Sequence, residues 1–184
     1  MHQPLHILAI SGSLRTASSN TAVLQAIKAL APADITLTLY EQMATLPYFN
    51  PDLDQENDTL PAPVGELRAW VGKADGILIS SPEYAHGVPG VLKNALDWLV
   101  SSLEFPSKPV ALINISPRST YVRASLSEIL STMSAFLVAD EAFTIPLPRH
   151  RLDVASMLAD PQITQAFSKA LATFIDTIRT REVR

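Results

Sequence analysis

The fold is decided at the start of the chain, by Leu5-His-Ile-Leu-Ala-Ile-Ser-Gly-Ser-Leu-Arg-Thr-Ala-Ser-Ser-Asn20. Its first six residues are almost all apolar, which is typical of a strand covered on both faces in a parallel sheet. A polar turn rich in serine follows at residues 11–20, and an apolar stripe with helical spacing begins directly after it. The succession of strand, polar turn and helix predicts the first unit of an α/β protein.

Four more segments are predicted as strands. Two are continuous apolar runs like the first, and they suit the interior of a parallel sheet. Of the other two, one alternates apolar and polar side chains and one is stopped by Pro146, so these two suit opposite edges of the sheet. The two interior segments are 76–79 and 109–115. The alternating edge segment is 35–39, and the edge segment stopped by Pro146 is 143–145.

Apolar stripes with helical spacing fill the gaps between these strands. Four of the stripes are Ala22, Val23, Ala26, Ile27 and Leu30; Val64, Leu67, Val71 and Ala74; Val122, Leu126, Ile129, Leu130 and Met133; and Ile163, Phe167, Leu171, Phe174 and Ile178. Right-handed crossovers between alternating strands and helices give a doubly wound, three-layer α/β/α sandwich around a five-stranded parallel sheet. With residues 35–39 at an edge, the strand order 2-1-3-4-5 fits better than 3-2-1-4-5.

Length and composition exclude several classes of protein. The chain has 184 residues, of which 47% are hydrophobic and 17% charged, and this predicts a single globular domain over 1–184. It contains no cysteine, which excludes disulfides, thiolate metal sites and a cysteine nucleophile. The net charge is -4 and no basic stripe is present, so we expect no nucleic-acid partner. No apolar run is long enough for a membrane helix or a signal peptide, and we expect a cytoplasmic protein.

A fifth helix, predicted over residues 89–101, is apolar over a wide arc. Its two stripes are Leu92, Leu96 and Leu99, and Val91, Ala95 and Trp98. One stripe faces the sheet, whereas the other needs a further partner, which a second protomer provides in a homodimer or homotetramer. The alternative is that both stripes pack on one core.

The strand order also predicts where a ligand binds. In such a sheet, ligands lie beyond the carboxyl ends of the strands, at the point between the first and third strands. Three loops with unusual chemistry meet there, namely residues 11–20, 80–89 and 116–120. Residues 41–59 form the only long connection, which predicts either a loop beside the site or a solvated spacer.

The first loop has the composition of an anion site. It holds four serines, one threonine, one arginine and one asparagine between a buried strand and a helix. Hydroxyls, backbone N–H groups and the roughly half positive charge of a helix N-terminus together bind anions, and Arg15 adds a full charge with a forked set of donors. The alternative is that Ser18 or Ser19 only caps the helix. The density of donors favours phosphate binding.

Two missing sequence motifs narrow the range of phosphate compounds that the first loop is expected to bind. The chain lacks the pattern G-x-x-x-x-G-K-[ST] of ATP and GTP sites, and it lacks the G-x-G-x-x-G fingerprint of dinucleotide sites. A mononucleotide with a terminal phosphate, such as FMN, remains.

The second loop offers a shaped backbone and an aromatic face. Pro82, Gly87 and Pro89 constrain its path, and Tyr84 presents a ring to a flat heterocycle. Glu83 and His86 resemble an acid–base pair, but Glu83 is equally suited to holding the loop or a neighbouring subunit. His86 has no partner at metal-ligand spacing, so no metal site is predicted.

Two motifs, one in the first loop and one that begins in the second, together resemble the NAD(P)H-dependent FMN reductase family. This family has a flavodoxin-like fold and includes quinone, azo-dye and chromate reductases. The first is Gly12-Ser-Leu-Arg-x-x-Ser-x-Asn20, and the second is Pro82-Glu-Tyr-Ala-His-Gly-Val-Pro-Gly-Val-Leu-Lys-Asn-Ala-Leu-Asp-Trp98. Leu46-Pro-Tyr-Phe-Asn-Pro-Asp-Leu53 resembles a further segment of that family. The predicted elements follow the family's order, and they cover nearly the whole chain.

The resemblance implies FMN as the cofactor and NADPH or NADH as the hydride donor, with the chemistry carried by the flavin and by no catalytic side chain. The residues implied for the FMN phosphate and ribityl chain are Ser11, Ser13, Leu14, Arg15, Ser18 and Asn20. Those implied around the isoalloxazine are Pro82, Glu83, Tyr84 and Ala85, with His86 and Gly87 close by, and Ser116, Pro117 and Arg118 complete the pocket.

The chain departs from many members of this family at two places. Ala85 stands where many members have Asn, and residues 116–123 stand where many have a Gly-rich stretch. We expect the bulkier residues of the second stretch to affect how the nicotinamide reaches the flavin and which substrates the protein accepts. Arg118 favours an anionic reduced flavin or the phosphate of NADPH.

The implied function is that of an oxidoreductase. It transfers hydride from NAD(P)H to bound FMN and on to a quinone or another small acceptor, or it reduces FMN itself. Two alternatives are a flavodoxin-type electron carrier without catalytic activity and an FMN-binding redox sensor. A carrier usually presents a strongly acidic face to its partners, and the dispersed acidic residues and net charge of -4 disfavour it.

Overall fold

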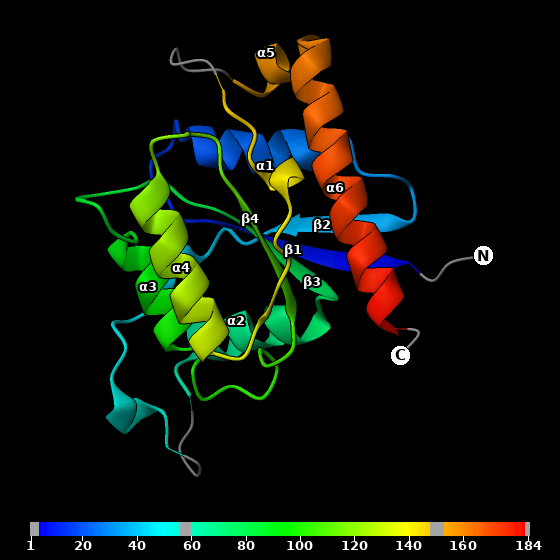
Figure 1. Cartoon of the computed structure of the whole chain (residues 1–184). Coiled ribbons are helices and arrows are strands. Elements are labelled where there is room, and N and C mark those ends of the chain that lie inside the picture. Colours follow the sequence, from blue (N-terminus) through cyan, green and yellow to red (C-terminus); the bar gives the residue numbers. More distant parts are fainter. Residues whose placement is uncertain (1–3, 56–59, 148–152, 183–184) are drawn as a thin grey trace.

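The computed structural model describes residues 4–55, 60–147 and 153–182. At its centre lies a five-stranded parallel sheet in the order β2-β1-β3-β4-β5, which confirms the predicted order (Figure 1). The strands are β1 (Leu5–Ser11), β2 (Ile35–Leu39), β3 (Gly76–Ser80), β4 (Pro109–Ile113) and β5 (Phe136–Leu137).

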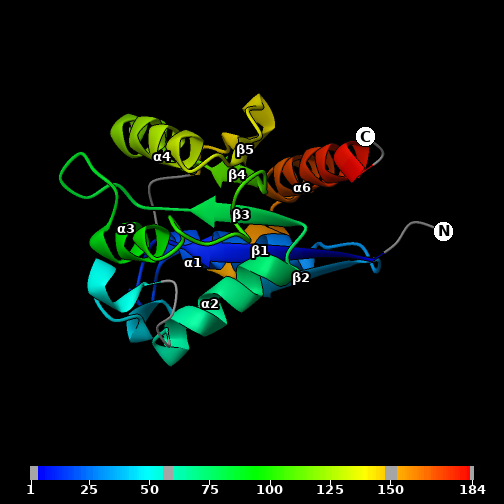
Figure 2. The same ribbon diagram turned by 90° about the horizontal axis from the view of Figure 1, so that it is seen from below.

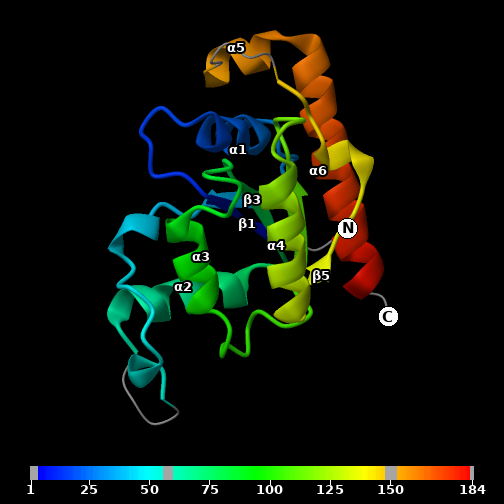
Figure 3. The same ribbon diagram turned by 60° about the vertical axis from the view of Figure 1, so that its left-hand side comes forward.

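Helices cover both faces of the sheet (Figure 3). One face carries α1 (Ser19–Ala29), α5 (Val154–Ala159) and α6 (Pro161–Glu182), and the other carries α2 (Ala62–Lys73), α3 (Gly90–Asp97) and α4 (Thr120–Thr132). The predicted stripes lie in α1, α2, α4 and α6. The helix α5 has no counterpart among the predicted elements, because its six residues are too few to show a periodic stripe.

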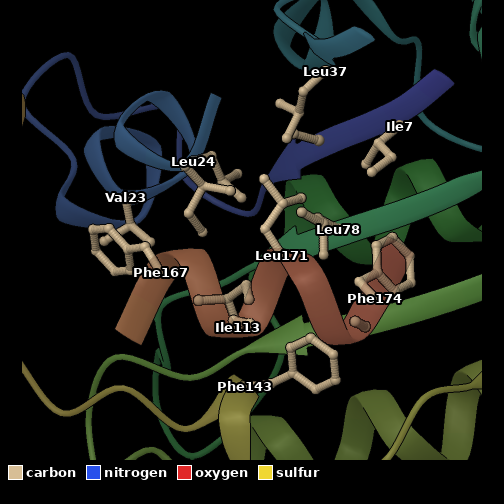
Figure 4. Packing of buried hydrophobic residues seen from close by; sticks show 14 of the residues in the cluster. Ile7, Val23, Leu24, Leu37, Leu78, Ile113, Phe143, Phe167, Leu171 and Phe174 are labelled. Carbon is tan, nitrogen blue, oxygen red and sulfur yellow. The ribbon is translucent and has the colours of Figure 1, made fainter. Parts of the chain in front are cut away.

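Each face of the sheet has its own hydrophobic core. In β1, Ile7 and Ala9 belong to the core shared with α1 and α6, whereas Leu8 and Ile10 belong to the core shared with α2 and α3. Figure 4 shows the first core, in which aromatic and leucine side chains of α6 lie against the sheet and α1. Alternate residues of one strand therefore serve opposite cores, which is why the strand reads as a continuous apolar run.

The two edges of the sheet differ in how well they match the prediction. At β2, Ile35 and Leu37 are buried while Thr36 is exposed, which confirms the edge strand with one open face. At the opposite edge, the predicted strand over residues 143–145 is only partly confirmed, because these residues lie at that edge but form a single bridge instead of a strand. The strand β5 lies earlier, and it pairs Phe136 and Leu137 with β4.

A short helical turn explains the displaced edge. The Asp140 side chain accepts a hydrogen bond from the Ala142 N–H at 2.7 Å and starts a 3-10 helix over Glu141–Phe143. Beyond this turn, Thr144 forms a single parallel bridge to Asn114, and the Ile145 N–H donates to the Asn114 carbonyl at 2.8 Å. The edge therefore consists of two short pieces beside β4, because a side-chain cap interrupts the chain between them.

The second apolar stripe of α3 is covered by the chain itself. Trp98, directly after the helix, is fully buried; its indole N–H donates to the Pro47 carbonyl at 2.8 Å, and its ring meets Phe49 edge to face at 5.0 Å. Asn94 adds two further bonds to Pro47 and Phe49. The expectation that this stripe needs a second protomer is therefore corrected, because the long connection supplies the partner.

The long connection is also tied down further along. Arg68 of α2 pairs with Asp54 at 2.9 Å and donates to the Trp98 carbonyl at 2.7 Å, and the Ser101 hydroxyl also donates to Asp54. The part of the connection that the structure describes is thus packed on α2 and α3 and is no solvated spacer. Residues 56–59 of the connection lie outside the described residues.

None of the helices in residues 4–55, 60–147 and 153–182 is both long and apolar enough to cross a membrane.

Candidate functional site

Three loops follow β1, β3 and β4 at the carboxyl edge of the sheet, which lies on the left in Figure 2. The first two are in direct contact, because the Gly12 N–H donates to the Ser80 carbonyl at 2.9 Å. Ser11 and Ser80 also stand side by side in the register of β1 and β3. The strand order therefore brings the predicted site residues of all three loops to one edge of the sheet.

Serine hydroxyls organise the loop after β1. The Ser11 hydroxyl lies 2.8 Å from the Thr21 hydroxyl and accepts from the Ser13 N–H at 3.3 Å. Ser18 is the N-cap of α1, and its Oγ accepts from the Thr21 N–H at 3.3 Å. The sequence-based alternative that Ser18 caps the helix is therefore confirmed, but the cap uses only a lone pair of Ser18 Oγ. The hydroxyl proton remains free to donate to an anion.

The start of α1 adds backbone donors. Among the described residues, the N–H groups of Ser19 and Asn20 have no hydrogen-bond partner. The Asn20 side chain is buried, and its oxygen accepts from the Ser80 hydroxyl at 2.9 Å. This bond ties the start of α1 to the end of β3, so only the Asn20 amide group is left for a ligand. The positive end of the helix dipole and two free N–H groups favour an anion here.

The tip of this loop carries an unpaired positive charge. The Arg15 N–H donates to the Ser13 hydroxyl at 3.3 Å, while its guanidinium forms no ion pair or hydrogen bond within the described part of the chain. Leu14 is 53% exposed beside it. A free guanidinium in the loop that leads into the helix adds a charged donor suited to a phosphate.

Gly12 stands where no side chain fits. A Cβ atom at this position would lie 2.5 Å from Ser81 Oγ, 2.9 Å from Ser81 Cβ and 3.2 Å from Leu92 Cδ2. The first and second loops can approach this closely only because residue 12 has no side chain.

We therefore expect Gly12→Ala to push the two loops apart. Stability should fall by about 1–3 kcal/mol, the usual cost of overpacking, and affinity for FMN should fall at least about tenfold. Urea unfolding and FMN titration measure the two effects. Gly65→Ala is the control, because a Cβ at Gly65 meets nothing within 4 Å. Equal behaviour of the two variants would contradict this account of Gly12.

The loop after β3 makes a strained two-residue turn. Ala85 and His86 have φ values of 48° and 57°, and two hydrogen bonds of 3.2 and 2.9 Å join Tyr84 to Gly87 across the turn. These features match a type I′ hairpin turn, which normally contains Asn-Gly. For other residues the left-handed conformation costs roughly 1–2 kcal/mol each. Such strain concentrates at functional sites, and here the turn begins at Tyr84, which is 55% exposed.

Replacing Ala85 tests this strain directly. Because Asn tolerates a positive φ, we expect Ala85→Asn to stabilise the protein by about 0.5–1 kcal/mol. Ala85→Val should destabilise it, because a β-branched residue tolerates this conformation least. The midpoint of urea unfolding at constant m value measures both changes. A lower midpoint for Ala85→Asn would mean that the turn is unstrained.

The same turn is joined to α4. The Glu83 carboxylate accepts from the Val122 N–H at 3.0 Å and so caps the first turn of α4, since Ser119 at the N-cap makes no side-chain bond. His86 stacks on Tyr121 with ring centroids 4.2 Å apart. The first role proposed for Glu83, holding the loop, is therefore present. Tyr121 was not among the predicted site residues, although an aromatic residue in the first turn after the third loop is a usable signal.

The loop after β4 is held by its own side chains. Asn114 Oδ1 accepts from the Ser116 N–H at 3.1 Å, and Ser116 Oγ accepts from the Arg118 N–H at 3.3 Å. Arg118 is exposed, and no partner for its guanidinium is found in the described residues. A small cavity of about 20 Å³ lies between β3, β4 and α4, lined in part by Ser81 and Asn114.

In the described residues no cluster is suited to a metal ion, and Tyr40 and Lys108, whose pKa values are shifted, lie outside the three loops. No group of three or more His, Asp or Glu side chains in the described residues is placed to hold a metal ion. Burial, with a contribution from Glu66, raises the pKa of Tyr40 to about 12, so this phenol stays neutral in the core. Burial lowers the pKa of Lys108, against the opposing effect of Asp75 and Glu104.

The donor set fits a flavin mononucleotide. The loop after β1 and the start of α1 together hold free backbone N–H groups, the Ser18 hydroxyl and the Arg15 guanidinium, which are the donors that a phosphate requires. The exposed Tyr84 and the rigid backbone of residues 84–87 lie in the loop after the neighbouring strand β3, where they can offer a face and an edge to a flat heterocycle.

Sequence comparison supports the same conclusion. The family described as NADPH-dependent FMN reductase matches residues 5–148. A quinone reductase from Escherichia coli strain K12 is 34% identical over 164 residues, which cover 88% of this chain and 85% of that protein. An NAD(P)H-dependent FMN reductase from Pseudomonas aeruginosa is 36% identical over 118 residues, covering 63% of this chain and 62% of that protein.

Solved structures share the fold. FerB, a flavoenzyme NAD(P)H:(acceptor) oxidoreductase from Paracoccus denitrificans, superposes with a TM-score of 0.81 at 24% identity, covering 96% of this chain and 98% of that chain. The azoreductase AzrA superposes with a TM-score of 0.54 at 13% identity, covering 95% and 98% of the two chains. Together with the strand order, these likenesses show a flavodoxin-like fold.

Proposed function

The chain belongs to the NADPH-dependent FMN reductase family, and we propose that it is an FMN-dependent enzyme that oxidises NADPH or NADH and reduces quinones or similar small acceptors. One observation carries the proposal: free hydrogen-bond donors at the start of α1 and a strained turn after β3 both follow adjacent strands at the carboxyl edge of the sheet, at its switch point. The whole chain serves as a single FMN-binding domain, since both cores share one sheet.

The residues divide into two groups by their chemistry. The phosphate and ribityl chain are assigned to the first loop, and the ring system is assigned to the second and third. The first group is Ser11, Ser13, Leu14, Arg15, Ser18 and Asn20. The second is Pro82, Glu83, Tyr84, Ala85, His86, Gly87, Ser116 and Arg118. Of these, Asn20 and Glu83 act mainly by positioning, because their side-chain oxygens bond Ser80 and Val122.

The chemistry requires little of the side chains. When bound, FMN would supply the redox chemistry, namely hydride uptake from the nicotinamide and two-electron reduction of the acceptor. With one proton from water, NAD(P)H and a quinone become NAD(P)⁺ and a hydroquinone. The chain holds the reactants and supplies fixed dipoles and positive charge, from the start of α1, Arg15 and Arg118, to a site that gains negative charge. Glu83 is held by the Val122 N–H, so it serves as an anchor rather than as a general acid.

A visible spectrum under anaerobic conditions tests cofactor and activity together. We expect purified protein, after soaking with FMN, to be yellow, and NADPH or NADH to bleach it. A quinone should then restore the colour, with one nicotinamide oxidised for each quinone reduced. A protein that retains no flavin, or a bound flavin that neither nicotinamide bleaches, would refute the proposal. The second outcome would favour an electron carrier.

Two further properties belong to this proposal. Four exposed apolar side chains support a homodimer or homotetramer, because water-exposed groups of this size are often buried between copies. They are Tyr48, Leu53, Val100 and Leu103. The use of a nicotinamide cofactor supports a cytoplasmic location. Light scattering at several protein concentrations measures the first property, and cell fractionation measures the second.

A further inference from the structure

Two aromatic side chains, one from the loop after β3 and one from the first turn of α4, stack on each other. The rings of His86 and Tyr121 have centroids 4.2 Å apart and planes inclined by 15°. Both residues are exposed, and Tyr121 remains 54% accessible although one of its faces is covered. A stacked pair with this much exposed surface can accept another flat ring.

The pair is held from both sides before any ligand arrives. His86 occupies the second left-handed position of the turn, with φ of 57°, and the two bonds between Tyr84 and Gly87 close that turn. Glu83, in the same loop, accepts from the Val122 N–H in the first turn of α4, next to Tyr121. Two independent anchors therefore fix the relative positions of the rings, and preorganised groups lose little freedom when a ligand binds.

The pair lies away from the phosphate side of the site. His86 follows β3 and Tyr121 follows β4, whereas the phosphate donors follow β1. Neighbouring strands are about 4.8 Å apart, so β4 lies about 10 Å across the sheet from β1. Arg118 lies on the same side as the pair, three residues before Tyr121, and it has no ion-pair partner in the described residues. The pair therefore combines aromatic faces with nearby positive charge.

We propose that His86 and Tyr121 form an acceptor-selecting wall, which binds planar aromatic acceptors by stacking and favours them over acceptors that have no flat ring. This inference rests on the proposed function, since it concerns the acceptor of that same reaction. A quinone gains negative charge as it is reduced, and the positive charge near the wall stabilises that change. The wall selects by shape and by the aromatic face, and it takes no part in electron transfer.

Steady-state kinetics with two acceptors separate selection from catalysis. Removing either ring by His86→Asn or Tyr121→Ala should lower kcat/KM for a naphthoquinone about five- to tenfold, mainly through KM. In Tyr121→Ala, kcat/KM for ferricyanide, which has no ring, should stay within about twofold of the wild-type value. Asn at position 86 keeps a residue that tolerates a positive φ. Tyr121→Phe keeps the stack and should behave as wild type, and Trp70→Ala removes an exposed ring from α2 as a control.

A binding measurement tests the wall without turnover. The ring protons of His86, identified among the four histidines by their loss in His86→Asn, should shift when redox-inert 2-naphthoate is titrated into the protein. They should not shift with cyclohexanecarboxylate, which has the same charge and no aromatic ring. In Tyr121→Ala, the response to naphthoate should weaken about five- to tenfold in affinity.

The outcomes separate the two proposals. A wild-type protein that takes up no flavin or oxidises no nicotinamide refutes the proposed function. In that case the naphthoate titration still tests whether His86 and Tyr121 bind a flat aromatic ring. An unchanged ratio of quinone to ferricyanide kcat/KM in both ring-removing variants overturns the wall, as does an absence of naphthoate-dependent shifts at His86. A loss of the ratio together with a loss of naphthoate affinity supports it.

Discussion

Replacing Arg15 with alanine is expected to raise the Kd for FMN about 10- to 100-fold, while the Kd for riboflavin, which lacks the phosphate, stays within about twofold. The guanidinium has no partner among the described residues, so its loss removes a phosphate ligand without breaking a bond within the chain. Hydrogen bonds to charged groups contribute about 1.5–3 kcal/mol each, which gives this range. Fluorescence titration of the flavin-free protein with both flavins measures the effect.

Salt and a second cation sharpen the test of Arg15. In the wild-type protein, FMN affinity should fall as ionic strength rises, and in Arg15→Ala this dependence should be weaker. Lys93→Ala removes an exposed cation that pairs with Asp97 on α3, and it should leave the FMN affinity unchanged. If Arg15→Ala weakened riboflavin and FMN equally, the loop would recognise something other than the phosphate.

Replacing Trp98 with alanine is expected to cost about 3–5 kcal/mol of stability, a large share of the roughly 5–15 kcal/mol that stabilises a typical domain. The indole is fully buried, meets Phe49 edge to face at 5.0 Å and donates to the Pro47 carbonyl at 2.8 Å. Its loss leaves a cavity and frees the long connection from α3. Urea unfolding measures the stability, and limited proteolysis should show cleavage within the freed connection.

The chain supplies its own control for Trp98, because it contains two tryptophans. Trp70 is 40% exposed on α2, and Trp70→Ala should change stability by less than about 1 kcal/mol. Trp98→Phe keeps most of the ring and should cost about 1–2 kcal/mol. Equal unfolding midpoints for Trp98→Ala and Trp70→Ala would show that the connection is not held by this side chain.

Sequence reasoning located the three loops because their position follows from the strand order alone. It did not reveal which groups Asn20 and Glu83 bond, since their partners, Ser80 and Val122, are distant in the chain. It also placed the last strand too late, because the cap at Asp140 acts over two residues and leaves the apolar pattern unchanged.

Local patterns in the sequence by themselves determined the parallel sheet, its order, the helices long enough to show a stripe, and the donor-rich loop after β1. These features depend on hydrophobic periodicity and on residue chemistry within a few positions of the chain. Only the tertiary structure decided that Trp98 is covered by Pro47 and Phe49 rather than by another protomer, and that His86 meets Tyr121. Such contacts join segments 35 or more residues apart, and no local pattern encodes which of several exposed faces will meet.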